Sequence, residues 1–129
     1  MKNSTLILGS SGYVGSNLKS YLNNSCGVDI LENKYLDIHE DYDKIPKSQI
    51  KKYRNVILLA AHSNPAACNG NPLYSLDNNV VKFVKLLRKI SKKQKLIYAS
   101  SSCVYDSKNG EIVTEESNSF TPLSYYDVT

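Results

Sequence analysis

Short apolar runs alternate with amphipathic or polar stretches along the chain. The runs lie at Leu6–Leu8 and at 27–33, 35–38, 55–62 and 95–100. Continuous apolar runs of this length are typical of parallel strands, which are buried on both faces. A helical pattern follows the first run at Val14, Leu18, Tyr21 and Leu22, and a longer one covers 72–90 with apolar positions at Leu73, Leu76, Val80, Val84 and Leu87. The alternation predicts an α/β fold built on a parallel sheet.

The remaining stretches predict less regular structure. We expect a short surface helix over 47–53, a loop over 63–71 and an irregular loop over 106–124. Pro72 suits the first turn of the long helix. Asn78 and Asn79 are unfavourable inside it. One of them is expected to hold a neighbouring backbone group or a ligand, unless both simply face solvent.

Three glycines follow the first strand at a spacing of three residues: Gly9, Gly12 and Gly15. We expect Gly9 to allow a sharp turn, Gly12 to let the backbone touch phosphate oxygens, and Gly15 to let the helix pack closely. A strand, a glycine turn and a helix N-terminus together form a site for a diphosphate. The alternative is a glycine-rich turn that binds nothing, which the later motifs disfavour.

An acidic residue, Glu32, lies at the end of the predicted second strand. A carboxylate there accepts hydrogen bonds from the adenosine ribose and repels a 2′-phosphate, which favours NAD over NADP. The absence of Arg at Ser10 and Ser11 points the same way. Lys34 is near enough to compensate a phosphate, and Glu32 as a plain surface residue is the competing interpretation.

Composition narrows the class of protein. A chain of 129 residues, 41% hydrophobic and 22% charged, suits one globular domain over residues 1–129. The N-terminus shows no signal-peptide pattern and no apolar run reaches the ~18 residues of a membrane span, so we expect a cytoplasmic protein without a membrane. Three cysteines without C-x-x-C spacing indicate reduced thiols and no metal site.

The net charge of +4 is concentrated around the end of the long helix, at Arg88, Lys89, Lys92, Lys93 and Lys95. Cations there complement the helix dipole. A patch that binds nucleic acid is the more specific alternative, but no aromatic residues are interleaved with these cations. We therefore expect no nucleic-acid partner.

The motifs, taken in order, resemble those of the extended short-chain dehydrogenases/reductases, in particular the NAD-dependent nucleotide-sugar epimerase/dehydratase family. They are G-x-x-G-Y-V-G at Gly9–Gly15, the acid at Glu32, L-A-A at Leu59–Ala61, P-L-x-x-x-D-N-N-V at Pro72–Val80, S-S-x-x-V-Y at Ser100–Tyr105 and P-x-S-x-Y at Pro122–Tyr126. The resemblance implies a Rossmann-like, doubly wound parallel sheet in a three-layer αβα arrangement with strand order 3-2-1-4-5.

The resemblance also implies a cofactor site. It would place Gly9, Ser11, Gly12, Tyr13, Val14 and Gly15 at the diphosphate, Glu32 at the ribose, Asp37 and Ile38 at the adenine, Ala60, Ala61 and His62 beside the nicotinamide, and Asn78 at the cofactor or the neighbouring strand end. The expected cofactor is NAD rather than NADP, and the expected partner is a nucleotide-diphosphate sugar.

The same resemblance assigns Ser101 as the catalytic hydroxyl and Tyr126 as the catalytic tyrosine of a Tyr-x-x-x-Lys motif. A free phenol titrates near pH 10, so a neighbouring Lys and the nicotinamide charge would be needed to lower its pKa. That Lys would be residue 130. We therefore expect an N-terminal fragment that lacks the end of the Rossmann domain and the sugar-binding lobe.

The residues after Ser101 separate the possible reactions. Family dehydratases carry Asp-Glu there, and this chain has Ser102 and Cys103, which favours a 4-epimerase. The Ser-Ser-Cys-x-Tyr pattern also resembles GDP-fucose synthase, in which the Cys acts as acid and base in epimerisation; Cys103 as a small buried residue is the competing interpretation. A non-catalytic dinucleotide-binding module is the third possibility. An unpaired sheet edge and an apolar helix surface predict self-association, with a dimer expected.

Overall fold

The computed structural model describes residues 4–105, 112–116, 122 and 124–129. The chain divides into two compact units. The first comprises residues 1–61 and 81–99 and contains the sheet. The second comprises residues 62–80 and 100–129 and contains short helices.

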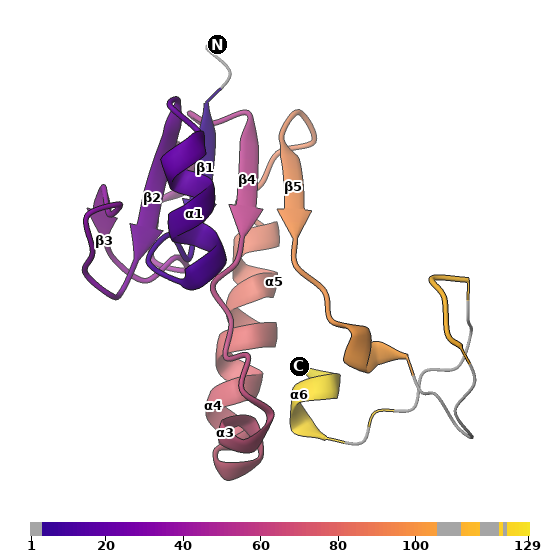
Figure 1. The fold of residues 1–129 in the computed structure, drawn as a ribbon. Helices are drawn as coiled ribbons and strands as arrows, with labels where there is room; N and C mark the ends of the chain where they lie inside the picture. Colours follow the sequence, from indigo (N-terminus) through magenta and orange to yellow (C-terminus); the bar gives the residue numbers. More distant parts are fainter. Residues whose placement is uncertain (1–3, 106–111, 117–121, 123) are drawn as a thin grey trace. The chain divides into compact units, whose positions relative to one another are not determined.

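The first unit is built on a five-stranded parallel sheet (Figure 1). Its strands are β1 (Thr5–Leu8), β2 (Ser25–Asp29), β3 (Ile38–His39), β4 (Asn55–Leu58) and β5 (Lys95–Tyr98). The order is β3-β2-β1-β4-β5, and every neighbouring pair is parallel. The predicted strand order is confirmed, and with it the Rossmann-like class.

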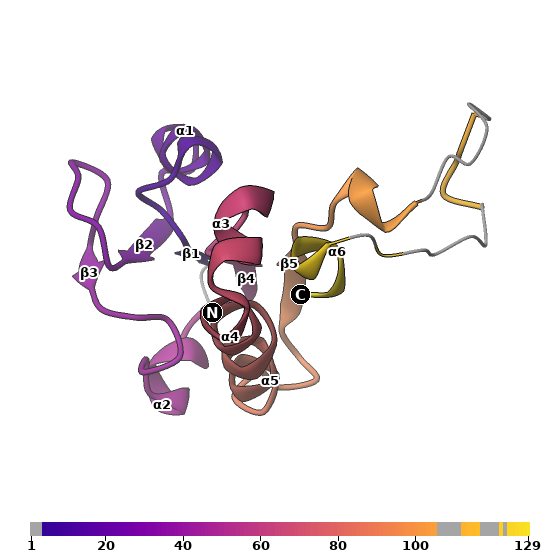
Figure 2. The same ribbon diagram turned by 90° about the horizontal axis from the view of Figure 1, so that it is seen from below.

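Helices cover both faces of this sheet. Helix α1 (Tyr13–Tyr21) lies on one face, and α2 (Lys47–Ile50) and α5 (Lys82–Leu87) lie on the other (Figure 2). All four residues of β1 are buried, because a central parallel strand has a layer on each side. Leu6, Leu8, Val56 and Leu58 form the core with Leu86 from α5.

The second unit consists of short helical elements. They are α3 (Pro65–Gly70), α4 (Pro72–Leu76), the 3₁₀ turn η2 (Ser102–Val104) and α6 (Tyr125–Val128). Helix α6 contacts both α3 and α4. A π-helical turn, η1 (Asp77–Val81), follows α4 and leads into α5.

Several predicted boundaries are wrong. The strands predicted over 35–38 and 55–62 are Ile38–His39 and Asn55–Leu58. Strand β2 ends at Asp29 and not near residue 33, because the Asp29 carboxylate accepts the Leu31 N–H and bends the chain; Leu31 is exposed despite its apolar side chain. The predicted loop over 63–71 contains α3. Asn64 caps that helix by accepting the Ala67 N–H, and Pro65 occupies its first turn.

The apolar positions predicted along the long helix are mostly exposed, in agreement with the open apolar helix surface predicted above. Leu73, Val84 and Leu87 are exposed, whereas Ser75 and Leu86 are fully buried. The predicted single helix over 72–90 is α4, η1 and α5 in succession. A π turn takes more residues per turn than an α turn, so it changes which positions of the following helix face the sheet.

No helix in the described part of the chain is long and apolar enough to cross a membrane. The three cysteines are free thiols: Cys68 is buried, Cys26 is half-buried and Cys103 is exposed. Among the described residues, no group of three or more His, Cys, Asp or Glu side chains could hold a metal ion. Most of the predicted loop over 106–124 lies outside the described residues.

Candidate cofactor and catalytic sites

The glycine turn joins β1 to α1 and is held by close backbone contacts. Gly9 has φ +96°, and a Cβ there would lie 2.5 Å from the Ala60 nitrogen. A Cβ at Gly15 would lie 2.0 Å from the Gly9 oxygen. Both positions therefore require glycine, for the turn and for the approach of the helix, as predicted.

Gly12 differs from the other two. It is the N-cap of α1, and among the described residues outside the helix's own backbone a Cβ there would approach only the Gly9 oxygen, at 3.6 Å. No side chain caps the helix and no acidic residue lies in its first turn. The N–H groups of this turn thus have no intrahelical acceptor, and the helix dipole adds positive potential. This end of α1 provides the donors that a diphosphate requires.

The end of β2 is hydrogen-bonded directly to the glycine turn. The Ser11 N–H donates to Oδ2 of Asp29 over 2.8 Å, and the Gly9 N–H donates to the Val28 oxygen over 2.9 Å. Asp29 is the acid at the carboxyl end of β2 and lies twenty positions after Gly9 in the sequence. A ribose-binding carboxylate is expected at this position of a dinucleotide fold.

Glu32, the residue predicted for that role, lies beyond the strand end. Its carboxylate is 81% exposed and lies 3.5 Å from Nδ1 of His39. The prediction rested on a strand that continued through Ile30 and Leu31, and both of these side chains are exposed. By the same reasoning, the acid at the strand end is Asp29, which sequence analysis missed.

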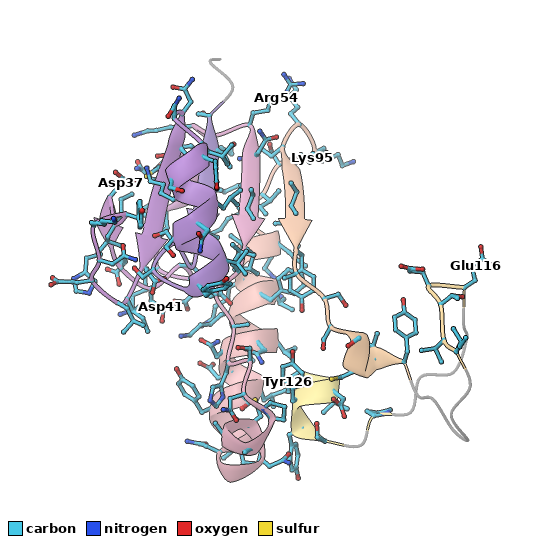
Figure 3. All side chains as sticks on the ribbon, viewed as in Figure 1. Asp37, Asp41, Arg54, Lys95, Glu116 and Tyr126 are labelled. Carbon is cyan, nitrogen blue, oxygen red and sulfur yellow. The ribbon has the colours of Figure 1, made fainter. Side chains whose placement is uncertain are left out.

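Asp37 lies just before β3 and binds the backbone of β2 (Figure 3). Its Oδ2 accepts the Gly27 N–H over 2.7 Å and lies 3.0 Å from Nζ of Lys19. Burial raises the pKa of Asp37, but the Gly27 hydrogen bond and Lys19 outweigh it, so the pKa lies below its usual value. Ile38 pairs with Val28 and packs against the core. The adenine contacts expected of Asp37 and Ile38 remain predictions.

The segment after β4 begins with two small residues. The Leu59 and Ala60 N–H groups both donate to the Leu8 oxygen, which keeps the chain beside β1 past the end of the strand. Ala60 packs against the core and Ala61 is exposed. Both follow the carboxyl end of β4, and the nicotinamide contacts expected of them remain predictions.

His62 opens the second unit and is held by two residues from the following helical turns. Asn79 accepts the His62 N–H at Oδ1 over 2.8 Å and donates from Nδ2 to the His62 oxygen over 3.0 Å. The His62 Nδ1 lies 2.8 Å from Oγ of the fully buried Ser75. Because Ser75 donates its single hydroxyl hydrogen to the Asn71 oxygen, it accepts from Nδ1–H.

Asn79 is therefore the asparagine whose side chain binds the His62 backbone, four residues after the end of β4. Asn78 donates to Oδ1 of Asn79 over 3.1 Å, and both lie in the π turn η1. Such π turns occur often at functional sites. The unfavourable Asn pair inside a helix was the sequence signal, but it did not distinguish the two residues. Cofactor contact by Asn78 remains a prediction.

Cys103 lies on the 3₁₀ turn η2, and Ser101 directly precedes this turn. Oγ of Ser101 caps this turn by accepting the Cys103 N–H over 3.2 Å. A hydroxyl that accepts one hydrogen bond still has its own hydrogen to donate. Cys103 is exposed, so its interpretation as a small buried residue is wrong.

Tyr126 lies on α6, and the ends of this helix are well fixed (Figure 3). Ser124 and Asp127 form a capping box: the Ser124 N–H donates to Oδ2 of Asp127 and the Asp127 N–H donates to Oγ of Ser124. The Tyr125 N–H donates to Oδ1 of Asn69, and Asn79 donates to Oγ1 of Thr129. In the described part of the chain, no hydrogen bond joins Ser101 to Tyr126.

Residues 5–129 match the sequence profile of the NAD dependent epimerase/dehydratase family. The chain belongs to this family. The match covers nearly the whole sequence, including the glycine turn, His62, Ser101 and Tyr126.

Individual proteins are also similar to this chain in sequence or in structure. Protein CapI of Staphylococcus aureus is 29% identical over an alignment of 151 residues, which covers 96% of this chain and 45% of CapI. The structure of MoeE5 in complex with UDP-glucuronic acid and NAD has a TM-score of 0.84 at 25% identity, covering 97% of this chain and 45% of MoeE5. The UDP-Glc/GlcNAc 4-epimerase of Campylobacter jejuni has a TM-score of 0.82 at 22% identity, covering 98% and 45%.

Proteins with other reactions share the fold. They include an L-threonine dehydrogenase of Clostridium difficile and a hypothetical dTDP-4-dehydrorhamnose reductase of Sulfolobus tokodaii. The chain spans less than half the length of each of these relatives.

Proposed function

We propose that this chain forms the cofactor-binding part of an NAD-dependent epimerase acting on a nucleotide-diphosphate sugar. The observation that carries the proposal is the Ser11–Asp29 hydrogen bond. It joins a diphosphate-type helix N-terminus to a ribose-type carboxylate in one rigid element. Family membership and the 4-epimerase among the relatives support the same function.

The residues present fit NAD. The first turn of α1 offers N–H donors without a side-chain cap, and Gly12 leaves the room that a phosphate oxygen needs. Asp29 provides acceptors for ribose hydroxyls, and its charge disfavours the 2′-phosphate of NADP. NAD, when bound, supplies the acceptor for a hydride from a sugar carbon.

Tyr126 and Ser101 carry the proton chemistry in this proposal. Hydride loss from a sugar carbinol also requires loss of the hydroxyl proton, which Tyr126 would accept as general base. Ser101 caps η2 through its oxygen and would donate its hydrogen to the same substrate oxygen, which orients it. A cation near the phenol is needed to lower the pKa of Tyr126.

Calorimetric titration with NAD and NADP tests the proposal. We expect NAD to bind and NADP to bind at least tenfold more weakly. Gly12→Glu places a carboxylate where phosphate is expected, without a backbone clash, and should abolish binding. Ser20→Glu adds the same charge on an exposed position further along α1 and should leave binding unchanged. A folded wild-type chain that binds neither cofactor would contradict the proposal.

A second candidate reaction rests on the exposure of Cys103. In an epimerase-reductase acting on a 4-keto sugar, an exposed thiol could move a proton at the carbon next to the ketone. Iodoacetamide labelling followed by peptide mass analysis tests this accessibility. We expect Cys103 to react before Cys26, whose pKa is raised by burial, and before the buried Cys68. Labelling of Cys26 or Cys68 ahead of Cys103 would remove the basis for this candidate.

We also propose that the chain self-associates through the open side of β5. Ile97 and Tyr98 of β5 are about half exposed, and so are Val84 and Leu87 of α5. Exposed apolar side chains beside an unpaired strand edge favour association. Sedimentation velocity at micromolar concentration should show a dimer, and a clean monomer would contradict it.

A further inference from the structure

Positive charge is concentrated at the amino-terminal edge of the sheet, the edge opposite the glycine turn. Residues 44–105 contain twelve of the sixteen Lys and Arg residues and a single acid, Asp77. Six of the twelve lie at or shortly before the starts of β4 and β5: Lys51, Lys52, Arg54, Lys92, Lys93 and Lys95. Figure 3 shows Arg54 and Lys95 at the starts of these neighbouring strands.

This edge is concave. One hollow of about 640 Å³ is lined by Lys51, Tyr53, Arg54, Ser91, Lys93 and Gln94. A second hollow of about 550 Å³ shares Arg54, Lys93 and Gln94 with the first and adds Asn55 and Lys95. We call the two together the basic cleft. Each hollow taken alone has the size of a small-molecule site, and such sites range over roughly 300–1,000 Å³.

Gln94 fixes the two walls of the basic cleft to each other. Its Nε2 donates to the Ile50 and Tyr53 oxygens over 2.8 Å each. Its Oε1 accepts the Ser91 N–H over 3.0 Å. The segments that carry Lys51 and Lys93 are thereby held at a fixed spacing, and a ligand does not have to order the backbone when it binds.

The lysines of the basic cleft are not neutralised within the described residues. Lys51, Lys93 and Lys95 have no carboxylate within 4.0 Å in that part of the chain. The lysines of α5 behave differently: Lys82 pairs with Asp41 at 2.5 Å, and Lys85 pairs with Asp43 at 3.2 Å. Neighbouring uncompensated cations on concave walls concentrate positive potential and attract a multiply charged anion.

We propose that the basic cleft binds a small compound carrying a diphosphate or triphosphate group. Such a group matches several convergent cations, because its oxygens accept several charge-assisted hydrogen bonds at once. A nucleic acid is disfavoured, since Tyr53 is the only aromatic residue among those lining the cleft and stacking requires more. The site is separate from the glycine turn and does not depend on the function proposed above.

Calorimetric titration with inorganic pyrophosphate tests this site. The double variant K51Q/K93Q removes two cations that line the cleft. The matched control K52Q/K92Q removes two exposed cations one position away that do not line it, so the net charge changes equally. We expect K51Q/K93Q to weaken binding at least tenfold and K52Q/K92Q to change it by less than about threefold.

Three results would overturn the proposal. The first is a folded wild type that does not bind pyrophosphate. The second is an equal loss of pyrophosphate affinity in the two double variants. The third is loss of pyrophosphate binding in Gly12→Glu, which would place the anion at the glycine turn. A single-stranded oligonucleotide and phosphatidylglycerol vesicles are also titrated. If either binds more tightly than pyrophosphate and both double variants weaken that binding equally, the edge is a diffuse polyanion-binding surface instead. Loss of NAD binding in Gly12→Glu alongside unchanged pyrophosphate binding would support both sites independently.

Discussion

The Ser11 N–H donates to the Asp29 carboxylate over 2.8 Å, so the glycine turn and the end of β2 move as one element. The other oxygen of Asp29 accepts the Leu31 N–H over 3.0 Å. Asp29 therefore orients the turn and ends the strand at the same time. Preorganised donors and acceptors of this kind lower the cost of ordering the protein when a ligand binds.

Asp29→Asn tests the ribose role. The amide keeps the size of the side chain, but one of its two oxygens becomes a donor and its charge is lost. We expect NAD affinity to fall roughly tenfold or more, since a lost charged hydrogen bond costs about 1.5–3 kcal/mol. Glu32→Gln is the matched control and should change NAD affinity by less than about threefold. If calorimetry shows a larger loss of NAD affinity for Glu32→Gln than for Asp29→Asn, Glu32 is the ribose acid and Asp29 is not.

Gly15→Ala tests the close approach of α1 to the turn. The added Cβ would lie 2.0 Å from the Gly9 oxygen, a backbone atom that cannot move alone. Overpacking of this kind costs about 1–3 kcal/mol of unfolding free energy. Gly70→Ala is the control, because no atom lies within 4 Å of a Cβ there and alanine favours a helix. Urea denaturation that ranks Gly70→Ala as the less stable variant would contradict this account.

Asn79→Ala tests how His62 is held. The variant removes both hydrogen bonds to the His62 backbone and the bond to Thr129, and an unsatisfied group costs about 1–3 kcal/mol. We expect amide exchange at His62 to accelerate at least tenfold. Asn78→Ala leaves the Asn79 bonds in place and should accelerate this exchange much less. Equal effects of the two variants would show that Asn79 has no special role.

The lowered pKa of Asp37 predicts how the stability of the fold depends on pH. Its pKa is lowered in the folded state, so its stabilising contribution is complete above the ordinary value of about 4 and is lost as pH falls through the folded value. Asp37→Asn should therefore be less stable than the wild type at pH 6. The difference in urea midpoint should shrink toward pH 3. A difference that stays constant over this range would show that the ionised carboxylate is not the source.

The glycine turn could be predicted because its geometry follows from covalent structure. Only glycine tolerates φ +96° at residue 9 and a backbone oxygen within 2.0 Å of the Cβ position at residue 15. The strand order was predictable from the family resemblance, which the parallel pairing of β1 with β2 and β4 bears out.

The prediction of Glu32 as the ribose acid rested on a second strand that continues past residue 30, whereas β2 ends at Asp29. Ile30 and Leu31 continue the apolar run of β2, and a side-chain bond from Asp29 that ends the strand is invisible to hydrophobic periodicity. Helix α3 did carry a readable start signal in Asn64-Pro65, but its composition favoured a loop. No residue preference marks the π turn around Asn79 in the sequence. Which face of α5 packs against the sheet could therefore be seen only in the structure.

The pairing of Leu8 with Leu58 has a consequence for synthesis of the chain. Strand β1 is made before both of its neighbours, and one of them, β4, is encoded about 50 residues later. At roughly 5–20 residues per second, the ribosome needs several seconds to supply β4. During that interval the apolar flank of β1 has no native partner. A nascent chain of this protein is therefore expected to be most dependent on chaperones before residue 58 has emerged.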